Sequence, residues 1–196
     1  MIQLQLVRKT VFVVLVSAGL VATGVASAAW GDQKAGTAGK GGKMSFTIKS
    51  TAFSEGANIP SRHTCDGVNL SPPLSWSGQP AGTKSFVLIV DDPDAPGGTF
   101  LHWTFFDIAS SVQALPEGQP AAKLGQSGIN DFGKSAYGGP CPPPGRGSHR
   151  YFFKLNALDI PSLGLSPGAT LIQIEQKIKG HVLGTAELIG RYERKR

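Results

Sequence analysis

The sequence predicts a mainly β fold, an antiparallel β-sandwich with a helix near the C-terminus. At least five segments have the apolar or alternating pattern of strands, whereas one segment has a clear helical period. The connections between them are long and rich in Pro and Gly, as in antiparallel sheets rather than in alternating β–α units. No internal repeat is visible, and the length of the chain suits one domain with one core.

Five segments are expected as strands, in chain order. MSFTIKSTAF alternates apolar and polar residues, which is typical of a strand with one buried face. SFVLIVD is apolar almost throughout, which predicts a strand buried on both faces. FLHWTFFDI, HRYFFKLNALD and TAELIGRY complete the set. Turn-forming residues predict loops at IPSRHTCDGVNLSPPLSW and over 111–136, where we expect one short turn of helix.

The segment LIQIEQKIKG, residues 171–180, is the expected helix. Thr170 is a suitable N-cap because its hydroxyl can accept a hydrogen bond from a free backbone N–H of the first turn. Gly180 is suited to end the helix. The apolar face would comprise Leu171, Ile172, Ile174 and Ile178.

Residues 1–28 have the pattern of a secretory signal peptide. A basic start, MIQLQLVRK, precedes an apolar run, and Ala26 and Ala28 form an A-x-A cleavage site. We expect cleavage near Ala28 and a periplasmic or secreted protein. An uncleaved anchor is less favoured. The apolar run, about residues 10–25, is short for a membrane span, which needs ~20 apolar residues. Residues 29–43 would be a flexible leader, and residues 44–196 the folded domain.

The charge of the chain argues against nucleic-acid binding. The chain carries 19 Lys and Arg against 13 Asp and Glu, a net charge of +6. No basic stripe with interleaved aromatic residues is present, as a nucleic-acid surface would require. The basic excess would only weakly favour an anionic ligand or membrane surface.

Cys65 and Cys141 are the two cysteines of the chain. Export would place them in an oxidising compartment, so we expect a disulfide in preference to two thiols. The sequence alone does not show whether the two sulfurs meet.

Three segments place polar side chains beside apolar strands. They are DDPDAP at 91–96, His102 within FLHWTFF, and His149 with Tyr151. Strand alternation would put His102 on one face with Phe100, Thr104 and Phe106, and would put His149 and Tyr151 on one face. A buried histidine is more often structural than functional, and these groups could simply form a network that holds two loops.

The loop YGGPCPPPGRGS before His149 favours a binding site. Its prolines are stiff and supply no N–H, and its glycines allow close approach to a ligand. The free amides of 145–148 could form an anion-holding nest, and a neighbouring histidine could donate to a phosphate oxygen. We therefore expect a small rigid pocket into which the strand delivers His149 and Tyr151.

Enzymatic alternatives have weaker support. Asp92, His102 and His149 could form a 2-His-1-carboxylate metal site, but the sequence has no H-E-x-x-H or paired-Cys spacing. A G-x-S-x-G elbow is absent as well. Cys141 and His149 could act as nucleophile and base only if Cys141 is free. We rank binding above these, with no catalytic residue, metal or cofactor.

DDPDAP followed by LHW, and GGPCPPPGRGSHRYFF, resemble the two signatures of the phosphatidylethanolamine-binding protein (PEBP) family, also called Raf kinase inhibitor-like proteins. TCDGVNLSPPLSW, NDFGKSAYGGPCPPPG and GHVLGTAELIG are similar to its bacterial branch. The resemblance covers residues 44–192. It implies a β-sandwich with Greek-key connections, a large and a smaller sheet, and a C-terminal helix.

The resemblance also implies a preformed pocket for phosphate-like headgroups. His149 and the loop amides would donate to the anion, Asp92 would fix a histidine tautomer or bind an ammonium, and His102 would line the base. Tyr137 and Tyr151 would close the pocket with their hydroxyls. The implied ligand-binding residues are Asp92, Pro96, His102, Tyr137, Cys141, Pro142, His149 and Tyr151.

The expected function is that of an exported, non-enzymatic protein that binds a small anion or phospholipid headgroup. One alternative is an inhibitor or regulator of a protein partner, such as a protease or kinase. Another is a weak hydrolase that uses Cys141 or a metal. The kinase inhibition of animal relatives is not transferred, because it depends on partners that an exported protein would not meet. The sequence leaves open whether the chain forms a homodimer and whether it binds a protein partner.

Overall fold

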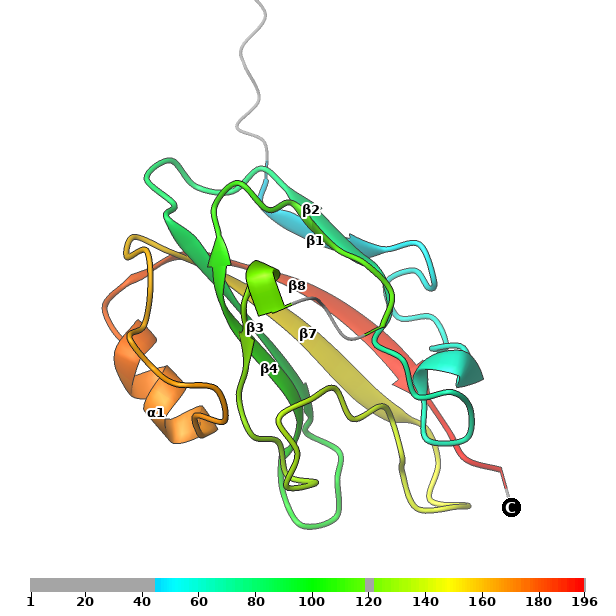
Figure 1. The fold of residues 1–196 in the computed structure, drawn as a ribbon. Helices are drawn as coiled ribbons and strands as arrows, with labels where there is room; N and C mark the ends of the chain where they lie inside the picture. Colours follow the sequence, from blue (N-terminus) through cyan, green and yellow to red (C-terminus); the bar gives the residue numbers. More distant parts are fainter. Residues whose placement is uncertain (1–44, 119–121, 196) are drawn as a thin grey trace, which may run out of the picture. The chain divides into compact units, whose positions relative to one another are not determined.

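The computed structural model describes residues 45–118 and 122–195. The expected signal peptide and leader lie outside these residues. The described part contains two antiparallel sheets and one α-helix, so the prediction of a mainly β fold with a helix toward the C-terminus is confirmed (Figure 1). No helix in the described ranges is both long and apolar enough to span a membrane.

The larger sheet has five strands in the order β6-β4-β3-β7-β8, and every neighbouring pair is antiparallel. All four long predicted strands of the C-terminal two thirds lie in it. A long connection from β4 returns the chain to β7, which pairs with β3 instead of β4. The strands are β3 (Ser85–Asp92), β4 (Phe100–Ala109), β6 (Gln126–Ser127), β7 (His149–Leu158) and β8 (Val182–Tyr192).

The smaller sheet has three strands in the order β1-β2-β5: β1 (Thr47–Ser50), β2 (Leu74–Ser77) and β5 (Ala114–Leu115). β2 differs from the expectation, since the sequence predicts a loop over these residues. β2 alternates buried Leu74 and Trp76 with exposed serines, and it pairs with β1 on one side and β5 on the other.

The main core fills the space between the two sheets. Phe86, Leu88 and Val90 of β3 contribute to it, together with Trp76 from the small sheet. The intervening residues Val87 and Ile89 face the opposite side of the large sheet, where a second core forms against α1. Every residue of β3 is buried, as the continuous apolar run predicts.

The helix α1 spans Leu171–Ile178 and begins as predicted. Thr170 and Gln173 form a capping box, in which each side chain accepts a hydrogen bond from the other's backbone N–H. Ile174 is buried against the sheet, but Ile172 is 66% exposed, so the predicted apolar face is too wide. Two short 3-10 helices complete the described part: η1 (Ser61–His63) and η2 (Ala122–Leu124), the second within 111–136.

A bulge in β4 changes the orientation of His102. Trp103 pairs with Val90 and Leu101 pairs with Asp91, so His102 is an extra residue without a partner on β3. A bulge re-aims side chains at the end of a sheet. The ring of His102 contacts Tyr151 in the inter-sheet core, whereas Phe106 lies in the second core. The prediction that His102 and Phe106 share a face is therefore wrong.

Candidate functional site

A cavity of about 270 Å³ lies where β3 ends and β7 begins. The loops that follow β3 and precede β7 lie at the same end of the large sheet (Figure 1). A mostly apolar lining with a few polar groups is typical of a small-molecule site. Six of the eight predicted residues line it. Its lining comprises Asp92, Ala95, Pro96, Phe100, His102, Phe132, Cys141, Pro142, Pro143 and His149.

Asp92 and His149 form a buried pair in this cavity. Nδ1 of His149 lies 2.8 Å from Oδ2 of Asp92, and both side chains are less than a tenth exposed. The other carboxylate oxygen accepts the backbone N–H of Asp94 at 2.8 Å. The Asp92 carboxylate thus accepts a hydrogen bond from Nδ1–H, and Nε2 of His149 is the nitrogen that can meet a ligand.

His102 is held by a backbone carbonyl. Its Nδ1 lies 2.7 Å from the carbonyl oxygen of Gly138, which can only accept, so Nδ1 carries a proton. Burial lowers the pKa of His102, although the Gly138 carbonyl and the Asp92 charge oppose that effect. His102 is therefore neutral at neutral pH, and its Nε2 is an acceptor.

Tyr151 lies beside the cavity and not in its lining. Its ring packs edge-on against that of His102, with the ring centroids 5.2 Å apart, and the residue is fully buried. Burial and the nearby Asp92 carboxylate raise the pKa of Tyr151, so the hydroxyl stays protonated. Within the described residues that hydroxyl has no well-formed hydrogen bond. It is thus a buried donor near Asp92 with unused capacity.

The loop after β3 is fixed to β7 by Asp94 and Arg150. The guanidinium contacts both carboxylate oxygens, at 2.6 and 2.9 Å, and the backbone N–H of Arg150 donates to the same side chain at 2.9 Å. These hydrogen bonds lower the pKa of Asp94 to about 2. Arg150 points away from His149 and Tyr151, as strand alternation predicts.

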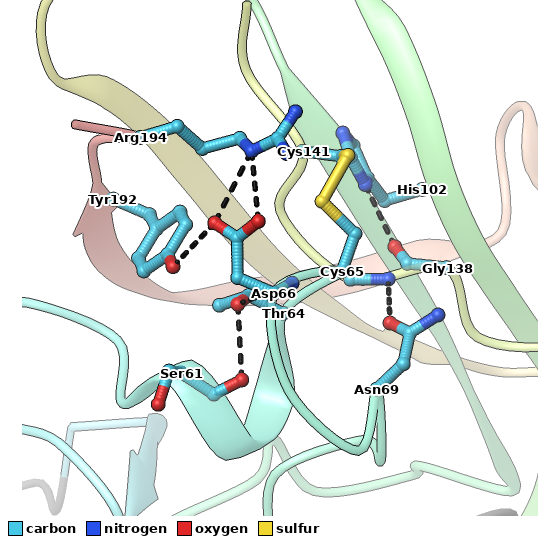
Figure 2. Close-up of a disulfide and its surroundings, with 11 residues drawn as sticks. Ser61, Thr64, Cys65, Asp66, Asn69, His102, Gly138, Cys141, Tyr192 and Arg194 are labelled. Carbon is cyan, nitrogen blue, oxygen red and sulfur yellow. Dashed lines mark hydrogen bonds and ion pairs between the residues drawn. A yellow bond between two sulfur atoms is a disulfide. The ribbon is translucent and has the colours of Figure 1, made fainter. Parts of the chain in front are cut away.

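The opposite wall is the proline loop, and a disulfide fixes it. Cys141 is bonded to Cys65, with the two Cα atoms 5.4 Å apart. The Cys65 N–H also donates to the carbonyl of Pro140 at 3.1 Å. Figure 2 shows the bridge beside His102 and its Gly138 partner. In this state Cys141 has no thiol, so it cannot serve as a nucleophile.

The amides expected to form an anion nest do not line the cavity. The Gly145 N–H donates to the carbonyl of Arg194, and the Arg146 N–H donates to Pro143. Residues 145–148 are absent from the lining. Of the two imidazoles in the lining, His149 is thus the one that can donate to an anion, because Nε2 of His102 is an acceptor. Among the described residues, no three His, Cys, Asp or Glu side chains are grouped to hold a metal ion.

Comparisons with known proteins show the family of the chain. Residues 49–193 match the sequence model of the phosphatidylethanolamine-binding protein family. The chain belongs to the PEBP family. A UPF0098 protein of Aquifex aeolicus is 52% identical over 150 residues, which cover 75% of this chain and 88% of the relative.

Two further relatives extend this PEBP comparison. The crystal structure of Escherichia coli YbcL, described as a member of the mammalian PEBP family, matches with a TM-score of 0.72 at 35% identity. The aligned region covers 76% of this chain and 99% of YbcL. LppC of Mycobacterium tuberculosis, which is named as a lipoprotein, is 45% identical over 148 residues, covering 76% of this chain and 72% of LppC.

Tyr137 does not reach the cavity of this PEBP. Its hydroxyl donates to the carbonyl of His63 at 2.8 Å, and its ring packs edge-on against Trp103 at 5.7 Å. The hydroxyl is therefore engaged elsewhere, in contrast to the expected role of closing the pocket. Tyr137 lines a neighbouring cavity instead.

Phe132 is a cavity residue that the sequence did not indicate. The centroid of its ring lies 4.8 Å from that of Phe100 and 5.4 Å from that of His102, and the residue is 41% exposed. It comes from the irregular stretch 111–136. The only signal is a single aromatic residue within the polar run NDFGK.

Proposed function

We propose that this PEBP is an exported, non-enzymatic protein whose cavity binds a small anion, either phosphate or a phospholipid headgroup. The observation that carries the proposal is the buried Asp92–His149 pair inside a cavity with fixed walls. A protonated His149 would donate from Nε2 to a phosphate oxygen while Nδ1 stays bonded to Asp92. A charge-assisted bond of this kind is about twice as strong as a neutral one.

The charges of the lining favour a particular anion. The described residues that line the cavity include one carboxylate and two imidazoles, and none of them is Lys or Arg. When His149 is protonated, its charge cancels that of Asp92. A bare dianion would therefore find no net positive charge, whereas a zwitterion brings its own cation. We expect phosphoethanolamine to bind more tightly than inorganic phosphate, with its ammonium near Asp92.

Export is part of the proposal because residues 1–28 have the pattern of a signal peptide. A relative named as a lipoprotein is consistent with a family branch that leaves the cytoplasm. The test is to express the full chain in a bacterium and to determine the mass of the protein in the periplasmic fraction. A chain that begins at Ala29 would support export, and a full-length chain confined to the cytoplasm would contradict it.

Calorimetric titration with phosphoethanolamine tests the binding function. His149→Asn keeps a donor where Nδ1 lies and removes Nε2, so Asp92 retains its partner. The loss of one charge-assisted hydrogen bond, about 1.5–3 kcal/mol, predicts an affinity roughly ten- to hundredfold weaker.

His181→Asn is the matched control for this titration. Nδ1 of His181 also lies 2.8 Å from a carboxylate oxygen, that of Asp159, but this pair is only partly buried and lies outside the cavity. This variant should bind like the original protein. Absence of saturable binding by the folded original protein would contradict the proposal.

A further inference from the structure

A second cavity lies on the other side of Phe132. Its volume is about 220 Å³, and its lining comprises Cys65, Asn69, Phe132, Lys134, Tyr137, Gly138 and Gly139. The two cavities share Phe132 and the disulfide, because Cys141 lines the first and Cys65 the second. Figure 2 shows Asn69, the bridge and His102 in one neighbourhood. The cavities are therefore adjacent.

The second cavity has a positively charged side chain that the first cavity lacks, that of Lys134. Among the residues that the structure describes, Lys134 lines it and no carboxylate does. Lys134 also takes part in none of the ion pairs of this part of the chain. Asn69 uses its oxygen to accept the Gly139 N–H at 2.8 Å, which leaves its NH₂ group as a donor. A cation and an amide donor without a competing carboxylate suit an anionic group.

The backbone of Gly138 and Gly139, which lines the second cavity, is held in place, so this side of the cavity is preformed. The Gly138 carbonyl accepts Nδ1 of His102, and the Gly138 N–H donates to the carbonyl of His102 at 3.0 Å. Neither Gly138 nor Gly139 has room for a Cβ atom, because the ring of Phe132 and the carbonyl of His63 occupy that space. A preformed site loses less free energy to ordering when it binds.

We propose that the second cavity is a subsite for another anionic group of the same ligand. The preferred ligand would be a phosphate ester that carries a phosphate or carboxylate a few bonds away. One group would sit at His149, the connection would cross the ring of Phe132, and the other group would meet Lys134 and Asn69. This inference rests on the proposed function of the first cavity.

The test is calorimetry with alkanediol bisphosphates of increasing length and with the matching alkyl monophosphates. One chain length should bind about five times more tightly than its monophosphate, beyond the twofold statistical advantage of two equivalent ends. Lys134→Gln should abolish this gain and leave the monophosphate affinity unchanged. Lys84→Gln, an equal loss of charge at the residue just before β3, should preserve the gain.

Each contrary result has a separate meaning. If no chain length exceeds the twofold gain, or if the gain survives Lys134→Gln, the second subsite is disproved. Equal weakening of mono- and bisphosphates by Lys134→Gln would also overturn it, because that pattern reflects long-range charge alone. Failure of the monophosphates to bind the original protein contradicts the proposed function of the first cavity instead.

Discussion

Nδ1 of His149 lies 2.8 Å from Oδ2 of Asp92, although 57 residues separate the two in the chain. Asp92 ends β3 and His149 begins β7, so the antiparallel pairing of these strands brings the two residues together. The pair is buried and so is protected from screening by solvent ions. Its geometry leaves one nitrogen, Nε2 of His149, for a ligand.

The burial of His102 makes the protein less stable in acid. Its pKa is lowered in the folded state, whereas the unfolded chain has the ordinary value of 6.5. The unfolded state therefore takes up the proton first as the pH falls below 6.5, and the free energy of unfolding decreases. His102→Asn keeps a donor for Gly138 but does not titrate.

Denaturant unfolding of both proteins between about pH 8 and pH 5 tests this. The stability difference between the original protein and His102→Asn should be constant above pH 6.5. Below that pH, the original protein should lose stability faster. Parallel curves over the whole range would show that the burial of His102 has no effect on its titration.

The Cys65–Cys141 bridge should contribute strongly to stability, because it closes a loop across 76 residues and restricts the unfolded chain. Reduction is expected to lower the free energy of unfolding by about 2–4 kcal/mol, measured in urea with and without a reductant. A Cys65→Ser, Cys141→Ser double variant should have the same free energy of unfolding as the reduced protein, and reductant should not change it. Equal stability of both redox forms would contradict this expectation.

Gly138 and Gly139 should respond differently to alanine. At Gly138 the new Cβ overlaps the ring of Phe132, which is partly exposed and can move. At Gly139 it overlaps the backbone carbonyl of His63, which cannot move without separating two loops.

We expect Gly139→Ala to lower the melting temperature more than Gly138→Ala does. The overlap at Gly139 should lower the free energy of unfolding by about 1–3 kcal/mol. Gly97→Ala is the control, because its Cβ meets nothing within 4 Å. Equal losses for Gly138→Ala and Gly139→Ala would be inconsistent with a wall formed by the 138–139 backbone.

The sequence predicted those features that depend on local patterns. The continuous apolar run of β3, the alternation of His149 and Tyr151, and the Thr170 cap depend on neighbours within a few residues. The candidate residues Asp92 and His149 stood out because polar groups directly adjoined buried strands. Their actual hydrogen bond depends on the pairing of β3 with β7.

Features set by distant contacts were not predictable in this way. The bulge at His102 depends on the register between β3 and β4. β2 is recognisable only through its pairing with β1 and β5, since its four residues follow a proline-rich loop. The positions of Phe132 and Tyr137 follow from how irregular loops pack, and such loops have no periodic pattern.

The most direct test of the account is to observe the ring nitrogens of His149 by ¹⁵N NMR during a titration with phosphate. Donation from Nε2 requires a proton there while Asp92 holds Nδ1. Phosphate should therefore shift the His149 nitrogens toward the values of a doubly protonated imidazole, and it should leave His181 unchanged. If the His149 signals do not move in the folded protein at saturating phosphate, His149 is not the anion donor and the central claim is wrong.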